Sequence, residues 1–400
     1  MPEAAVAALL LLLVVTAARV LSARAALVGL PPAAATAPVA DVTVLVAVRS
    51  GDPLLAGRLA RSVDTLAPAR VLLLVDDDDP AGESAARGAA SGHGHVEVLL
   101  FGPPPPGANP KVHKLVGAQH LCGPLVALLD DDTVLPPGGL ATLVGALDSA
   151  ELVTGVPVYL EQGSVWSRLV AAFVNGSALV TYLPMARLGP PVSINGMVVL
   201  TRRSDLEAVG GFDAVATATC DDYALALAFR RRGMRIGQVA QPAFLTTTVD
   251  GPVSYLRLLR RWMLFAEQVV RRDLSPRVVL CVVLPSVLPV VVLGLSLAAG
   301  PAYVAATLGA LLLGALGTRH LRRLATERSP AAATPESTAP GGLASSGATP
   351  DLGATGLAGV LLEPVAALLA PLHLLTAVLG PRHVVWRGRR VRVGVGSTTS

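Results

Sequence analysis

The 400-residue chain has little charge, few aromatic side chains and almost no cysteine. Charged residues make up 15% and aromatic residues 4%, against 52% hydrophobic residues. An ordinary soluble domain has about 25% charged residues, so much of this chain is expected to lie in a membrane. The three cysteines lie far apart without metal-binding spacing, which argues against a disulfide framework and indicates a reducing compartment. No basic stripe is interleaved with aromatic residues, so no nucleic-acid partner is expected.

The N-terminal segment, residues 1–30, is apolar enough to be a membrane anchor. No basic residue precedes its apolar run, whereas Arg19 and Arg24 come late in it. This charge order favours an uncleaved anchor with the following domain in the cytosol. A cleaved signal peptide is the alternative, because Ala23-Arg24-Ala25 resembles a cleavage site.

The C-terminal part contains two further apolar regions. Residues 278–317 include no charged side chain and predict two transmembrane helices with a break near Gly300-Pro301. Residues 357–380 form the other region, for which Pro364 and Pro371 favour a re-entrant or interfacial helix over a simple crossing. Three more segments complete the expected organisation: a basic amphipathic helix in the membrane interface at 253–277, a flexible linker at 324–356 and a basic tail at 381–400.

Residues 38–252 have an ordinary composition and alternate between strand and helix patterns, which predicts an α/β domain with a mixed, mainly parallel sheet. Strands are expected at 42–48, 71–75, 96–101, 125–129, 153–160 and 197–200, and helices at 54–66, 112–121 and 224–232. Two of these strands end in acidic clusters, Asp76–Asp79 and Asp130–Asp132. Ligands bind at the carboxyl ends of parallel strands, so both clusters are expected at one site.

The triplet Asp130-Asp131-Asp132 is the strongest single signal in this domain. Adjacent carboxylates repel one another unless a cation neutralises them, and oxygen ligands suit Mg²⁺ or Mn²⁺. On the triplet alone, a solvated acidic turn is an equal alternative. A second acidic pair, Asp221-Asp222, opens a predicted helix, where either carboxylate could serve only as a cap.

Together these elements resemble the membrane-bound family 2 glycosyltransferases, and within them the ceramide glucosyltransferase-like branch, which includes hopanoid-associated enzymes. The resemblance rests on several motifs in the expected order: Gly51-Asp52-Pro53, Asp76 to Ala81, Asn109-Pro110-Lys111, Asp130-x-Asp132, Gly196-Met197, Asp221-Asp222-Tyr223, Arg261-Trp262 and a weaker match at Trp386 to Arg389. It implies a GT-A-type nucleotide-sugar-binding domain between N- and C-terminal transmembrane helices. It also implies inverting transfer of a sugar, glucose or a similar hexose, from a UDP-sugar.

The resemblance assigns roles to particular residues. Asp130 and Asp132 would hold Mg²⁺ or Mn²⁺ on the diphosphate, while Asp222 would be the general base with support from Asp221. Arg261 and Trp262 would close over the leaving nucleotide. The remaining nucleotide-sugar contacts would come from Asp76, Asp78 and Lys111, with Asp130. For Asp78 the alternative is that it only shapes its loop with Asp79, and for Lys111 that it is an ordinary surface lysine.

One departure from the family pattern concerns the arginine-tryptophan motif. The family usually has Gln, Arg or His four residues before the tryptophan, where this chain has Leu258. Either Arg257 or Arg260 substitutes, or the diphosphate is less well stabilised. Asp221 in place of glutamate is a chemically mild difference.

The acceptor is inferred from location. An interfacial helix holds the site at the bilayer surface, where a ceramide-, hopanoid- or diacylglycerol-like lipid would present its hydroxyl group. The expected protein is therefore an integral membrane enzyme, in a bacterial-type plasma membrane, whose catalytic domain faces the cytosol. A processive polysaccharide synthase is the enzymatic alternative, and a transporter or scaffold the non-catalytic one.

Overall fold

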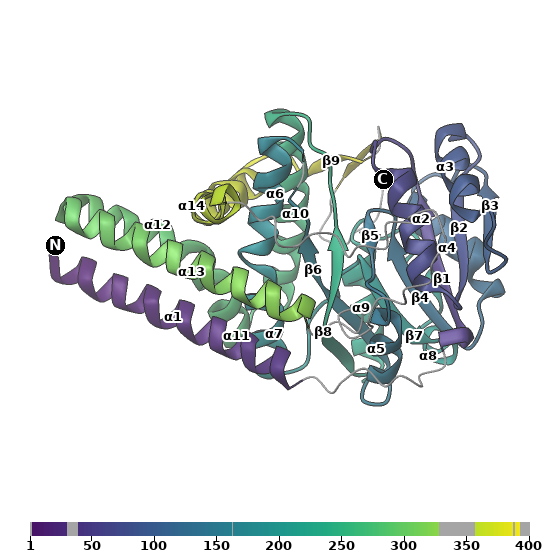
Figure 1. Ribbon diagram of the computed structural model, residues 1–400, viewed down its shortest axis with the longest axis horizontal. Coiled ribbons are helices and arrows are strands. Elements are labelled where there is room, and N and C mark those ends of the chain that lie inside the picture. Colours follow the sequence, from purple (N-terminus) through teal and green to yellow (C-terminus); the bar gives the residue numbers. More distant parts are fainter. Residues whose placement is uncertain (1, 30–38, 162, 328–356, 387–388, 393–400) are drawn as a thin grey trace, which may run out of the picture.

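The computed structural model describes residues 2–29, 39–161, 163–327, 357–386 and 389–392. A sheet covered by helices occupies one end of the molecule, and long helices extend from it at the other end (Figure 1). The N-terminal helix α1 (Pro2–Val28) runs beside the later helices α12 (Leu284–Ala299) and α13 (Pro301–Glu327). The predicted anchor therefore packs against helices that lie almost 300 residues away in the sequence.

Eight strands form one mixed sheet in the order β3-β2-β1-β4-β7-β6-β8-β5. They are β1 (Val42–Val48), β2 (Arg70–Asp76), β3 (Val96–Phe101), β4 (Leu125–Asp130), β5 (Thr133–Val134), β6 (Leu152–Tyr159), β7 (Val198–Arg202) and β8 (Ile236–Leu245). β1 pairs in parallel with β2 and β4, while β7 is antiparallel to β4 and β6. The predicted fold class is confirmed, although β5 and β8 were not predicted.

The central strands are apolar along their whole length because both faces of the sheet are covered. Val44 and Val46 of β1 enter one core cluster, whereas Leu45 enters the cluster on the other face. The helices around the sheet are α2 (Leu55–Leu66), α3 (Pro80–Ala90), α4 (Pro110–Ala118), α5 (Gly139–Ala146), α8 (Arg203–Ala208) and α9 (Asp221–Arg231). The helix predicted at 112–121 thus begins earlier, at Pro110, because the Asn109 side chain accepts hydrogen bonds from the first-turn N–H groups.

Five segments among the described residues are long and apolar enough to cross a membrane. Four correspond to the predicted apolar regions: α1, the stretch from Pro276 to Ala299 that ends in α12, α13, and α14 (Leu357–Leu379). The fifth, residues 165–187, comprises α6 (Val165–Asn175) and α7 (Ala178–Arg187), which were not predicted. Its most apolar window is 61% buried within the protein, so we assign it to the part of the molecule that carries the sheet.

Two predicted boundaries in the membrane region need correction. The break at Gly300-Pro301 lies where it was expected, but α13 continues to Glu327, beyond the predicted end at residue 317. Its last turns are helical because Leu321 and Ala325 pack into an apolar cluster with α1 and α7. The first four residues of the predicted 324–356 linker are therefore helical, and residues 328–356 lie outside the described residues.

The C-terminal helix α14 is continuous, and Pro364 and Pro371 do not interrupt it. It packs against α6 and against α10 (Pro252–Arg272), the helix predicted at 253–277. The hydroxyl of Tyr255 on α10 lies 2.9 Å from Nε2 of His373 on α14. A short hairpin, β9 (His383–Trp386) and β10 (Arg389–Arg392), follows α14 within the predicted basic tail, and residues 387–388 and 393–400 lie outside the described part. Interfacial binding of either helix stays a prediction.

Candidate active site

The two acidic clusters meet because β1 lies between the strands that carry them. β1 pairs in parallel with β2, which ends at Asp76, and with β4, which ends at Asp130. All three strands thus present their carboxyl ends at the same edge of the sheet. Clusters more than 50 residues apart in the sequence therefore form one polar site, as the strand pattern predicted.

Two basic residues that sequence reasoning missed hold Asp76. The Arg49 guanidinium lies 3.2 Å from Oδ2 of Asp76, and the fully buried Lys114 donates to the same oxygen at 3.0 Å. Arg49 also pairs with the exposed Asp78. Arg49 directly follows β1, so the rule that ligands bind at strand ends could have identified it. Lys114 gave no such signal, since it lies within a helix.

Asp79 fixes the loop after β2. Its side chain caps α3 through Gly82 N and accepts hydrogen bonds from the backbone and hydroxyl of Ser50. Burial opposes ionisation of this carboxyl, but the Ser50 and Gly82 hydrogen bonds outweigh burial and lower its pKa. The loop is therefore fixed by a charged carboxylate that takes no part in the open site.

The aspartate triplet is only partly neutralised by protein groups. Oδ1 of Asp130 lies 2.6 Å from Nζ of Lys111, and Asp131 accepts a hydrogen bond from Arg49 N at 2.9 Å. Burial and the charges of Asp130 and Asp131 raise the pKa of Asp132 to about 7. Burial also raises the pKa of Asp130, against the effect of Lys111. This surplus of negative charge is what a bound divalent cation would relieve.

The chemistry of these ligands fits Mg²⁺ or Mn²⁺, which prefer oxygen. Within the described ranges, no group of three or more His, Cys, Asp or Glu side chains is arranged to hold a metal ion. On the predicted assignment, the protein would supply Asp130 and Asp132, and the other ligands would be diphosphate and water. Mg²⁺ is usually bound in this way, through one or two carboxylates together with substrate phosphates.

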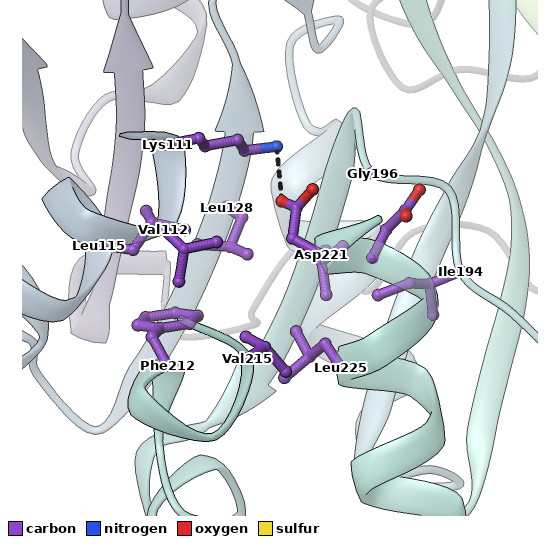
Figure 2. Close-up of a pocket in the computed structure, with 12 residues that line it drawn as sticks. Lys111, Val112, Leu115, Leu128, Ile194, Gly196, Phe212, Val215, Asp221 and Leu225 are labelled. Carbon is purple, nitrogen blue, oxygen red and sulfur yellow. Dashed lines mark ion pairs between the residues drawn. The ribbon is translucent and has the colours of Figure 1, made fainter. Parts of the chain in front are cut away.

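Lys111 links the triplet to the second acidic pair. Its Nζ lies 3.4 Å from Oδ2 of Asp221, an ion pair drawn in Figure 2, and 2.6 Å from Asp130. Burial alone would lower the pKa of Lys111, but the surrounding carboxylates raise it, so the side chain is a fixed positive charge. Only 18% of the side chain is exposed, which distinguishes it from an ordinary surface lysine.

Asp222 lines a pocket together with two other charged residues and mostly apolar side chains. The other charged residues are Lys111 and Asp221, whose ion pair Figure 2 shows. The apolar lining comes from α4, β4, β7, α9 and neighbouring loops: Val112, Leu115, Leu128, Ile194, Val199, Phe212, Val215 and Leu225. Figure 2 shows Phe212, Val215 and Leu225 below Lys111 and Asp221.

The carboxylate of Asp222 is hydrogen-bonded through one oxygen and lies close to Gly196 with the other. Its Oδ1 accepts hydrogen bonds from Cys220 Sγ at 2.9 Å and from Tyr223 N at 2.8 Å. A Cβ atom at Gly196 would lie 3.1 Å from Oδ2, so glycine there leaves space for that oxygen. Burial, followed by the neighbouring Asp221, raises the pKa of Asp222. Asp222 also lies in the first turn of α9, where the helix dipole stabilises its charge, so a structural role and a catalytic role are compatible.

Arg261 and Trp262 approach the triplet through Tyr159, which sequence reasoning also missed. The Trp262 ring meets the Tyr159 ring edge-on at a centroid distance of 6.3 Å. Burial, together with the charge of Asp132, raises the pKa of Tyr159, whereas Arg261 opposes this rise. Tyr159 ends β6 and thus lies between the acidic triplet and α10. Its position at a strand end was the signal available in the sequence.

Arg257 and Arg260 are the two arginines predicted to substitute at the Leu258 position. Arg257 is exposed, Leu258 packs against the main core, and Arg260 donates to the carbonyl groups of Thr376 and Pro381 at the end of α14. A contact between either arginine and a diphosphate stays a prediction.

Comparisons with known proteins agree with this geometry. The sequence profile of glycosyl transferase family 21 matches residues 5–399, and the chain belongs to this family. Ceramide glucosyltransferase 1 of Caenorhabditis elegans is 26% identical over 176 residues, which is 43% of this chain and 38% of that protein. The predicted resemblance to ceramide glucosyltransferases is therefore confirmed, although the chain matches well under half of this relative's length.

A solved structure shows the same fold. The mannosyltransferase PcManGT from Pyrobaculum calidifontis, in complex with GDP-Man and Mn²⁺, superposes with a TM-score of 0.51 at 20% sequence identity. The match covers 83% of this chain and 97% of that chain. The chain thus belongs to glycosyl transferase family 21 and has a GT-A-like fold, and several of its described helices could span a membrane.

Proposed function

We propose that this protein transfers a hexose from a UDP-sugar to the hydroxyl group of a membrane lipid, with inversion at the sugar carbon. The observation that carries the proposal is that Lys111 joins Asp130 of the triplet to Asp221, beside the pocket that Asp222 faces. Groups suited to holding a diphosphate and a group suited to taking a proton thus share one site. We further propose that this site faces the cytosol, with residues 38–252 as the catalytic domain.

The donor end would be organised by the strand ends. Asp76, held by Arg49 and Lys114, would accept hydrogen bonds from the uracil or ribose, and Asp78 would contribute from the same loop. Asp130 and Asp132 would hold a divalent cation, which supplies charge neutralisation for the departing diphosphate. Arg261 and Trp262 would cover the nucleotide from α10.

At the acceptor end, Asp222 would act as general base. Its carboxylate takes the proton of the acceptor hydroxyl as the oxygen attacks the sugar carbon. The new carbon–oxygen bond forms while the bond to the diphosphate breaks on the opposite face, which gives inversion. Lys111 and Asp221 would position Asp222 and keep its charge separate from that of the triplet.

The acceptor assignment rests on the membrane helices and on the family. A ceramide-, hopanoid- or diacylglycerol-like lipid would reach the site from the bilayer between α10 and the helices packed against it. The ceramide glucosyltransferase of C. elegans supports a lipid acceptor, whereas the solved mannosyltransferase binds GDP-Man. A test of the donor must therefore include guanosine as well as uridine nucleotides.

The proposal is tested by incubating membranes that contain the full chain with radiolabelled UDP-glucose, UDP-galactose, UDP-N-acetylglucosamine and GDP-mannose. We expect label from a UDP-hexose in the extracted lipid, and we expect EDTA to reduce it more than about tenfold, because the metal supplies several kcal/mol of stabilisation. Added Mn²⁺ or Mg²⁺ should restore transfer. Label that enters only an insoluble polymer would favour a polysaccharide synthase, and no labelled lipid from any donor would refute the proposal.

A second prediction concerns the pH dependence of transfer. The positive charge of Lys111 lowers the pKa of Asp222, against the raising effects of burial and Asp221. Lys111→Met should therefore raise that pKa further. Because the base acts when deprotonated, the acidic limb of the kcat/KM profile should move to higher pH.

Lys111→Arg keeps the charge and is the matched control for this prediction. It should leave the acidic limb close to that of the wild type, at saturating Mn²⁺ and nucleotide sugar. An acidic limb that does not move in Lys111→Met would show that Lys111 does not influence the base.

A further inference from the structure

A second buried polar cluster lies where α13 and α14 meet the part of the molecule that carries the sheet. We call it the junction cluster: Glu161, Asn175, Arg319, Arg322 and Glu363. Arg322 of α13 lies 2.6 Å from Oε1 of Glu363 on α14, and its Nη1 donates to the carbonyl of Asn175 at 3.0 Å. Thr318 donates a further hydrogen bond to Glu363. Glu161 and the three charged partners on α13 and α14 influence one another electrostatically.

The burial of this cluster is unusual for charged groups. The side chains of Arg322 and Glu363 are 7% and 3% exposed. Both belong to helices that are apolar enough to span a membrane. Ionisable residues in such helices are expensive to bury, and they commonly mark binding or transport sites.

The junction cluster is connected directly to the candidate active site. The Asn175 side chain accepts from Tyr159 N and donates to Tyr159 O, both at 2.9 Å. The Tyr159 ring contacts Trp262, and Glu161 lies only two residues after Tyr159. The Tyr159 side chain therefore contacts Trp262 of the candidate active site, and the Tyr159 backbone is hydrogen-bonded to Asn175 of the junction cluster.

Among the described residues, four polar atoms of the cluster are buried without a hydrogen bond, and two of them, Arg322 Nη2 and Glu363 Oε1, are the atoms of the ion pair. The other two have no such partner. Glu161 Oε1 and Arg319 Nε are buried, and neither is hydrogen-bonded within the part of the chain that the structure describes. Buried polar atoms without partners are rare, because each loses its hydration without compensation. One of these atoms is an acceptor and the other a donor. Together they match a ligand group that both donates and accepts, or two adjacent groups.

We propose that the junction cluster is a polar subsite for the lipid acceptor, which rests on the proposed function. Glu161 Oε1 and Arg319 Nε bind an amide, ester or second hydroxyl group of the lipid. The Arg322–Glu363 ion pair holds α13, which carries Arg319, against α14. The enzyme therefore prefers a lipid alcohol with a second polar group over a simple long-chain alcohol.

The test compares three acceptors with the full-length protein in one detergent: ceramide, 1,2-diacylglycerol and hexadecanol. Glu161→Leu and Arg319→Met should each raise the KM of the preferred polar lipid about tenfold to hundredfold, the range for one hydrogen bond to a charged group. Glu161→Gln keeps an acceptor oxygen and should recover part of this loss. The KM of hexadecanol and the Kd of UDP should be unchanged in all three variants.

Arg323→Met is the matched control, because Arg323 is exposed on the same helix as Arg319. It should leave every KM unchanged. An equal rise in KM for ceramide and hexadecanol, or no rise for any acceptor, would overturn the subsite. If Glu161→Leu fails to fold, Glu161→Gln and Arg319→Met still decide the question. Wild-type protein that labels none of the three lipids would contradict the proposed function itself.

Discussion

Asp222→Asn is expected to reduce lipid glycosylation about 10²- to 10⁴-fold, the usual contribution of a general base. The carboxamide has the size of the carboxylate but cannot take the acceptor proton. Its side-chain oxygen can still accept from Cys220 Sγ and Tyr223 N, which hold Oδ1 in the native protein. The measurement is initial-rate transfer to lipid, together with the Kd of UDP, which should not change.

Asp221→Asn is the comparison for Asp222→Asn. It removes the contact at 3.4 Å from Lys111 but leaves the proposed base in place. We expect a loss of about tenfold or less, because a surface or partly exposed ion pair contributes little. Equal losses of transfer in the two variants would contradict the assignment of Asp222 as the base and Asp221 as its supporting residue. Loss of UDP binding in Asp222→Asn would place this residue in the donor site instead.

Asp132→Asn is expected to reduce transfer about 10²- to 10³-fold, because removal of a metal ligand loses several kcal/mol of charge stabilisation on the leaving diphosphate. Folding should be unaffected or improved in EDTA, since the substitution relieves repulsion from Asp130 and Asp131. Thermal unfolding in EDTA and Mn²⁺ titration of activity measure the two effects separately.

Asp131→Asn, at the neighbouring position, distinguishes the loss of a metal ligand from the loss of a nearby negative charge. Asp131 accepts from Arg49 N, a bond that asparagine can preserve through its own side-chain oxygen. Transfer should therefore stay within about tenfold of the wild type, with a nearly normal Mn²⁺ requirement. A larger loss in Asp131→Asn than in Asp132→Asn would indicate that Asp131, rather than Asp132, is the metal ligand.

The sequence was sufficient for features that depend on local pattern. Continuous apolar runs predicted β1, β2 and β4, and the acidic residues after β2 and β4 predicted a site at their carboxyl ends. The apolar character of α1, α12, α13 and α14 was equally plain, because length and hydropathy suffice to identify such helices. The same patterns could not find α6 and α7, which are apolar yet largely buried by protein.

The cationic partners of the site could not be predicted in the same way. Lys111 looked equally like a surface lysine, and Lys114 attracted no notice, because helical spacing does not show which carboxylate a lysine will meet. Their contacts with Asp130 and Asp76 depend on how α4 packs across the ends of β1, β2 and β4. The contact between Tyr159 and Trp262 likewise depends on the packing of α10, which the sequence pattern does not show.

By itself, the sequence determined β1, β2 and β4, the apolar helices α1, α12, α13 and α14, and the acidic groups at strand ends, because each follows from side-chain periodicity and charge within a few residues. Only the tertiary structure decided which of these groups meet. It joined Asp130 to Asp221 through Lys111, and it brought Arg322 and Glu363 together behind Tyr159. Those contacts connect residues from 19 positions apart, for Lys111 and Asp130, to 110 positions apart, for Lys111 and Asp221. They depend on the order of strands in the sheet and the packing of helices, which no local pattern encodes.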